Sequence, residues 1–254
     1  MKIVLPVVLL IGFCLVHFIK LMRLYLILVD RQIPFERFLL AYMRTTLLNL
    51  VVPFKLGEIY RVIVFSRLSK GAKTGFFSVL IDRFFDTFAL VLILLPYQLL
   101  SGGKVTIPVM LLGAFLIGIV MLFIIFPSTF AFLNRYIIMA KTSKRSMMTL
   151  KALEVTNDWY EYAKKLVTGR YGIMILLSLG AWMVEMLVFA GFAGMIGENF
   201  GAASFAAYID SILSLSTNSL NRTYTLISVI IVAVLTVLSM IYFVVAIKRN
   251  NSNG

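Results

Sequence analysis

The sequence predicts an all-α integral membrane protein, a polytopic helical bundle. Of its 254 residues 61% are hydrophobic and 14% are charged, and the mean hydropathy is +0.99. This composition is typical of a chain whose solvent is mostly lipid, so it excludes a water-soluble globule. One cysteine, Cys14, and one histidine, His17, leave no internal disulfide, no Cys/His zinc site and no two-histidine relay. We therefore expect no metal, no cofactor and no enzymatic activity.

Five apolar segments reach the roughly twenty residues that a membrane-spanning helix needs. The first lies near the N-terminus but is too long for a signal-peptide core, so we expect it to be retained. The five predicted spans are residues 3–29, 76–100, 107–126, 172–196 and 224–247.

The first of these spans is longer than the bilayer requires. At 1.5 Å per residue its roughly 27 residues extend about 40 Å, whereas the hydrocarbon core is roughly 30 Å thick. We therefore expect the end that carries Lys20 and Arg23 to lie at a membrane interface.

Two further apolar segments, residues 38–65 and 200–220, are interrupted by polar residues, and the distribution of basic residues indicates how they sit. The net charge is +13, and such an excess usually lies on cytoplasmic loops rather than in a nucleic-acid site. Five spans with an external N-terminus and a cytoplasmic C-terminus place every basic cluster in the cytoplasm if both broken segments are re-entrant. The sequence therefore predicts two opposed re-entrant hairpins.

Residues 147–168 are predicted to form a cytoplasmic amphipathic helix. Apolar residues recur there in steps of three and four, from Met148 to Leu166, and the charged residues fall between them. This helix either lies on the inner leaflet or packs against the bundle. The alternative is specific recognition of anionic lipid or of a partner.

Charged residues gather in two short stretches of otherwise apolar sequence. A charge near the bilayer centre costs from about 2.5 to well over about 10 kcal/mol, so these groups need mutual pairing or a water-filled cavity. The six residues are Lys55, Glu58, Arg61, Asp82, Arg83 and Asp86.

Helical spacing predicts contact between the two stretches. Asp82 and Asp86 lie one turn apart on one helical face, and Glu58 and Arg61 are stacked at a spacing of three. Salt links between the stretches are therefore expected.

A turn is predicted at Pro53 to Gly57. Backbone N–H groups at the start of the helix that begins near Glu58, together with Lys55, would stabilise an anion there.

These observations support two interpretations. In the functional one, the three cations of the six form a partly hydrated site for a lipid headgroup phosphate, and the three carboxylates orient them. In the structural one, the charges pair only to hold the hairpin, notably Asp82 and Arg83 near the cytoplasmic start of their span. Glu185 either pairs within the core or belongs to the same cavity.

Three elements of the sequence form a pattern: Arg23, Asn49-x-x-x-Pro53-x-x-x-Gly57-Glu58-x-x-Arg61 and Asp82-Arg83-x-x-Asp86. Through them the chain, from Arg23 to about Gly197, resembles the transmembrane domain of lysylphosphatidylglycerol synthases and the wider flippase-like family of that name. Trp182-x-x-Glu185 is a weaker feature of the resemblance, which implies that Arg23, Asn49 and Glu185 also line the cavity.

The chain departs from the family pattern in three ways. Family members usually have an extra N-terminal span, and they usually carry a Pro-Gly-Gly-x-Gly-x-Glu element in the second hairpin, where this chain has only Ser214 to Asn221. This sequence also does not include the aminoacyl-transferring domain of the synthases. Lipid lysylation is therefore not expected of this chain.

The resemblance implies a flippase-like transporter of the plasma membrane that moves a phosphate-bearing glycolipid or an aminoacylated phospholipid between leaflets during envelope biogenesis. Two opposed hairpins are also the arrangement expected for alternating access. Its expected partners are membrane lipids with an anionic or lipid-linked phosphate headgroup. The alternative is a non-transporting scaffold for an envelope glycosyltransferase or polysaccharide enzyme.

Overall fold

The computed structural model describes residues 4–52, 56–100, 105–139, 144–197 and 219–252, and this part of the chain contains helices and no strand. The predicted all-α class is confirmed. The helices are α1 (Val4–Leu28), η1 (Val29–Arg31), α2 (Phe35–Val51), α3 (Leu56–Leu68), α4 (Ala72–Leu100), α5 (Ile107–Met139), α6 (Lys144–Val167), α7 (Tyr171–Ile196) and α9 (Ser219–Ser252).

Four of the described helices, α1, α5, α7 and α9, are long and apolar enough to cross a membrane. The predicted span 76–100 lies in α4, a 29-residue helix that is not among these four and carries charged residues near its middle. The predicted span 107–126 lies in α5, which continues to Met139 with Pro127 inside it.

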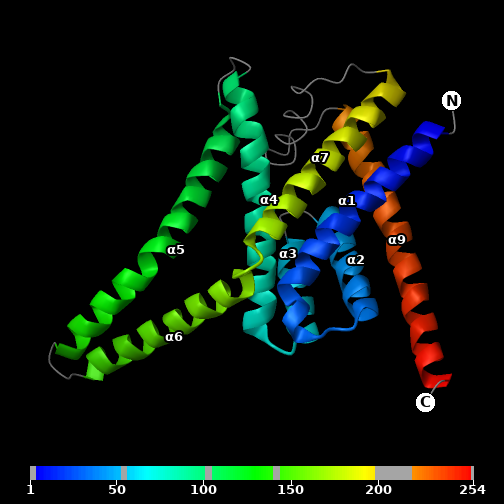
Figure 1. Cartoon of the computed structure of the whole chain (residues 1–254). Coiled ribbons are helices and arrows are strands. Elements are labelled where there is room, and N and C mark those ends of the chain that lie inside the picture. Colours follow the sequence, from blue (N-terminus) through cyan, green and yellow to red (C-terminus); the bar gives the residue numbers. More distant parts are fainter. Residues whose placement is uncertain (1–3, 53–55, 101–104, 140–143, 198–218, 253–254) are drawn as a thin grey trace.

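The first broken segment folds into a helical hairpin. α2 has 17 residues and α3 has 13, so they are about 25 and 20 Å long and each is shorter than a hydrocarbon core of roughly 30 Å. The link from α1 into α2 and the link from α3 into α4 lie at the same end of the bundle (Figure 1). This shape supports a re-entrant hairpin. Residues 200–218 of the second predicted hairpin lie outside the described residues.

Two apolar cores hold the helices together. One contains Leu24 of α1, Phe38 of α2 and Phe65 of α3, all completely buried. The other contains Leu94 of α4 and Phe189 of α7 and extends to α5 and α9. Because α4 and α7 contribute to both cores, charges placed near their middles come to lie between helices and away from lipid.

The amphipathic helix is α6, which lies beside α5 and leads to the start of α7 (Figure 1). Leu166 of its apolar stripe is buried, and the ring of Tyr162 lies 6.1 Å from that of Phe77 on α4. Met148, at the other end of the stripe, is 78% exposed. Only the C-terminal part of the predicted stripe therefore packs on the bundle.

Candidate functional site: a charge cluster on four helices

Asn49, Gly57 and Glu58 join the two helices of the hairpin. A Cβ atom at Gly57 would fall far inside van der Waals contact with the Cα atom of Asn49, so only glycine permits this approach of α3 to α2. The approach lets Asn49 Nδ2 donate a hydrogen bond of 2.7 Å to Glu58 Oε1. The spacing of these residues therefore has a packing reason.

Asp82 of α4 is the centre of the cluster and is completely buried. Its Oδ1 accepts a hydrogen bond of 2.8 Å from Arg23 Nε on α1. Its Oδ2 lies 3.4 Å from Arg61 Nη2 on α3 and 3.2 Å from Arg83 Nη2. One carboxylate thus binds three guanidinium groups from three helices, and the predicted salt links between the two charged stretches are present.

Arg23 and Arg61 are held in the interior. Their side chains are 1% and 3% exposed, and the ring of Tyr42 on α2 lies 5.5 Å from the Arg61 guanidinium carbon. Arg23 Nη1 also donates hydrogen bonds to Asp86 Oδ1 at 3.0 Å and to Ser178 Oγ of α7 at 2.9 Å. Arg23 does not snorkel outward as predicted, because carboxylates on α4 bind its guanidinium inside the bundle. That this end of α1 lies at a membrane interface stays a prediction.

Arg83 is the most exposed cation of the cluster. Its side chain is 39% exposed and its three ion pairs are long: 3.2 Å to Asp82, 3.4 Å to Glu58 and 3.6 Å to Asp86. By contrast, the two ion pairs of Arg23 measure 2.8 and 3.0 Å. Arg83 is therefore held less tightly than Arg23 and is accessible from outside the cluster.

A second ion pair extends the cluster along α1 and α7. Lys20 Nζ lies 2.6 Å from Glu185 Oε2, and these side chains are 21% and 13% exposed. The Lys20 ammonium also lies 5.0 Å from the centre of the Trp182 ring, whose Nε1 donates a hydrogen bond to the Asp86 carbonyl oxygen at 3.1 Å. The predicted pairing of Glu185 is present, and its partner is Lys20.

The cluster is electrically balanced within the described residues. Four cations face four carboxylates, so the formal charges cancel and no group is buried as an isolated ion. Such balance removes most of the penalty for charges in a membrane interior. The eight residues are Lys20, Arg23, Arg61, Arg83, Glu58, Asp82, Asp86 and Glu185.

Hydrogen-bonding capacity in the cluster is nevertheless incomplete on the side of the hairpin. Three buried atoms of the cluster have no hydrogen-bond partner among the described residues: Glu58 Oε2, Arg61 Nε and Arg83 Nε. Such atoms are uncommon in folded proteins, and they cost free energy unless water or a ligand reaches them. This side of the cluster is therefore the part that can accept a polar ligand.

The structure brings together nearly all the predicted site residues. Lys55 is the exception, because it lies outside the described residues. No group of three or more His, Cys, Asp or Glu side chains in the described part is arranged to hold a metal ion.

Sequence reasoning missed Lys20 as an ion-pair partner and missed Ser178 altogether. Both had a weak signal. Lys20 lies three residues before Arg23 in an apolar helix, and Ser178 lies seven residues, or two helical turns, before Glu185.

Comparison with protein families matched one family, described as lysylphosphatidylglycerol synthase TM region, over residues 1–216. The match includes α1 to α7, and with them all eight residues of the charge cluster. Comparisons with curated proteins and with solved structures gave no match.

Proposed function

Because this chain belongs to the lysylphosphatidylglycerol synthase TM region family, a family of membrane domains, we propose that it is a flippase-like transporter of a phosphate-bearing lipid. The cargo class is a glycolipid, a polyprenyl-phosphate-linked saccharide or an aminoacylated phospholipid of the cell envelope. The single observation that carries the proposal is Arg83, a partly exposed cation with three long ion pairs at the edge of a buried cluster.

The chemistry of guanidinium groups explains why Arg83 suits this role. A phosphate accepts two parallel hydrogen bonds from one guanidinium, and such charge-assisted bonds are shorter and stronger than contacts of 3.4 to 3.6 Å. A headgroup phosphate can therefore displace Glu58 or Asp86 from Arg83. Asp86 would keep its ion pair with Arg23, and Glu58 would keep the hydrogen bond from Asn49. Arg23 stays bound to Asp82 throughout, because this ion pair is short and both of its side chains are buried.

The hairpin supplies an element that can change its position. Its contribution to the cluster consists of Glu58 and Arg61, and each reaches α4 through ion pairs of 3.4 Å. When a phosphate replaces Glu58 at Arg83, one of these two links is broken. In this scheme, headgroup binding shifts the equilibrium between two positions of α2 and α3 relative to α4.

The experiment is lipid transfer in proteoliposomes. Purified protein is reconstituted, and fluorescent phosphatidylglycerol is compared with fluorescent phosphatidylcholine by quenching of the outer leaflet. Loss of one charge-assisted hydrogen bond to the phosphate weakens lipid binding by at least about tenfold. Arg83→Gln should therefore slow transfer of the anionic lipid by that factor. Arg83→Lys, which keeps the charge, should restore part of the rate.

The matched control is Arg67→Gln, which removes an exposed arginine on α3 outside the cluster and should leave transfer unchanged. Thermal unfolding of each variant separates a loss of transfer from a loss of fold. Equal rates for Arg83→Gln and the unchanged protein would contradict the assignment of Arg83.

A scaffold for an envelope enzyme is the second candidate, and the balance of four cations against four carboxylates favours it. A cluster whose charges only pair with one another holds helices together and needs no cargo. If the unchanged protein transfers neither lipid in proteoliposomes, this second function takes precedence.

A further inference from the structure

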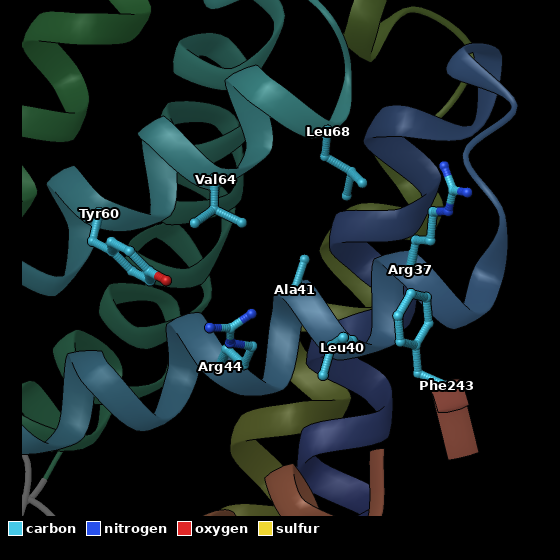
Figure 2. Close-up of a pocket in the computed structure, with 8 residues that line it drawn as sticks. All are labelled: Arg37, Leu40, Ala41, Arg44, Tyr60, Val64, Leu68 and Phe243. Carbon is cyan, nitrogen blue, oxygen red and sulfur yellow. The ribbon is translucent and has the colours of Figure 1, made fainter. Parts of the chain in front are cut away.

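A pocket of about 200 Å³ opens between α2, α3 and α9, separate from the charge cluster (Figure 2). Two arginines of α2, Arg37 and Arg44, lie seven residues apart and hence about 10 Å along the helix axis. The other residues that line it are Leu40, Ala41, Tyr60, Val64, Leu68 and Phe243.

The charge on the walls of this pocket is unbalanced. It has two arginines and no carboxylate, and neither arginine forms an ion pair with any described residue. A second pocket, of about 700 Å³ beside α6, has three lysines and three carboxylates, and the buried cluster is balanced as well. Of these three sites, the pocket with Arg37 and Arg44 therefore attracts an anion most strongly.

The remaining walls indicate the kind of anion. Leu40, Val64, Leu68 and Phe243 provide apolar surface between and beside the arginines, and Tyr60 adds a hydroxyl group (Figure 2). Sites that enclose a whole small molecule measure roughly 300–1,000 Å³, so a pocket of 200 Å³ holds only part of a larger ligand. A ligand with an anionic headgroup inside and apolar chains outside matches both features.

The position of the pocket in the fold fits such a ligand. Arg37 lies in the first turn of α2, at the end of the bundle where α1 enters the hairpin, and Phe243 lies in the C-terminal half of α9. Arginines at the end of a membrane helix reach the level of lipid phosphates, and anionic lipids neutralise cations there. The apolar outer faces of α3 and α9, with Ile63 and Tyr242 exposed, are where acyl chains would lie.

We propose that this pocket binds the phosphate of an anionic phospholipid, with Arg37 and Arg44 as its ligands and Phe243 of α9 against the lipid. The bound lipid connects α9 to the hairpin, where Thr236 Oγ1 already donates a hydrogen bond of 3.4 Å to the Met43 carbonyl oxygen. This lipid is a resident of the fold and not the cargo, so the proposal does not depend on transport.

The test is lipid binding measured by native mass spectrometry and by thermal unfolding of the full chain in detergent. Phosphatidylglycerol, phosphatidylcholine and inorganic phosphate are the three probes. Phosphatidylglycerol should raise the unfolding temperature and remain bound in the gas phase, whereas the other two should do neither. Replacing both arginines by Gln should weaken phosphatidylglycerol binding by at least about tenfold, since each arginine donates charge-assisted hydrogen bonds.

Two further variants keep the test decisive. Arg67→Gln with Lys70→Gln removes two positive charges at the end of α3 without touching the pocket, so it should bind phosphatidylglycerol like the unchanged protein. Leu68→Glu places a carboxylate in the pocket wall and should abolish binding although both arginines remain. This variant still tests the proposal if the Arg37→Gln, Arg44→Gln double variant does not fold.

Three results would overturn the proposal. The first is equal binding of phosphatidylcholine and phosphatidylglycerol, and the second is unchanged phosphatidylglycerol binding in Leu68→Glu. The third is full stabilisation by inorganic phosphate alone, which would assign the pocket to a soluble anion. Because Arg83 does not line this pocket, failure here leaves the transfer experiment unaffected.

Discussion

Replacing Asp82 by Asn tests whether the charge cluster stabilises the bundle. The substitution keeps the size of the side chain but removes the one carboxylate that binds Arg23, Arg61 and Arg83. Four cations then face three carboxylates, and the surplus charge lies in a site where Asp82 and Arg23 are each 1% exposed or less. The expected result is a large loss of stability with little change in helix content.

The expected magnitude follows from burial. Removing one partner of a buried ion pair costs about 3–5 kcal/mol, because the remaining charge stays desolvated. For a chain of this size, each kcal/mol corresponds to roughly 2–4 °C in the unfolding temperature. Asp82→Asn should therefore lower that temperature by about 6–20 °C, measured by fluorescence-detected unfolding in detergent.

The matched control is Asp30→Asn. Asp30 also pairs with an arginine, Arg170, at 2.7 Å, but its side chain is 53% exposed. An exposed pair contributes about 0.2–1 kcal/mol after screening by solvent, so this variant should unfold within a few degrees of the unchanged protein.

A double variant separates charge balance from the loss of individual contacts. Combining Asp82→Asn with Arg61→Gln restores equal numbers of opposite charges, so the double variant should lose less stability than the sum of the two single variants. An unfolding temperature for Asp82→Asn equal to that of Asp30→Asn would refute the view that the cluster stabilises the bundle.

Three further predictions concern other parts of the fold. Gly75→Ala should lower the free energy of unfolding by about 1–3 kcal/mol, because the added Cβ would overlap the backbone of α3. Gly118→Ala has open space and should be neutral or slightly stabilising, and thermal unfolding of both variants checks this. Lys20→Met should destabilise the protein by leaving a partly buried carboxylate on α7, and adding Glu185→Gln should recover part of the loss in a double-mutant cycle. A single cysteine at position 168, in a background without the native cysteine, should be labelled only after cells are made permeable. The reason is that the basic segment around it is predicted to be cytoplasmic, so labelling in intact cells would contradict that topology.

The amino-acid sequence by itself determined the class of protein and the position of its unusual polar residues. Long apolar runs specify membrane helices, because a backbone in lipid must satisfy its own hydrogen bonds. Charges at helical spacing, such as Asp82 and Asp86, indicated that the two charged stretches meet. The end of α2 at Val51 was also readable, since Pro53 disfavours continuation of the helix.

Only the tertiary structure decided which of these charges pair with one another. Helix length alone predicted that Arg23 and Lys20 emerge or snorkel from the end of their helix, yet carboxylates on α4 and α7 bind both side chains within the bundle. Pairing between segments more than fifty residues apart depends on which helix faces touch, and local periodicity carries no information about that. The pocket with Arg37 and Arg44, which form no ion pair with a described residue, also depends on the tertiary structure, because it lies where three helices meet.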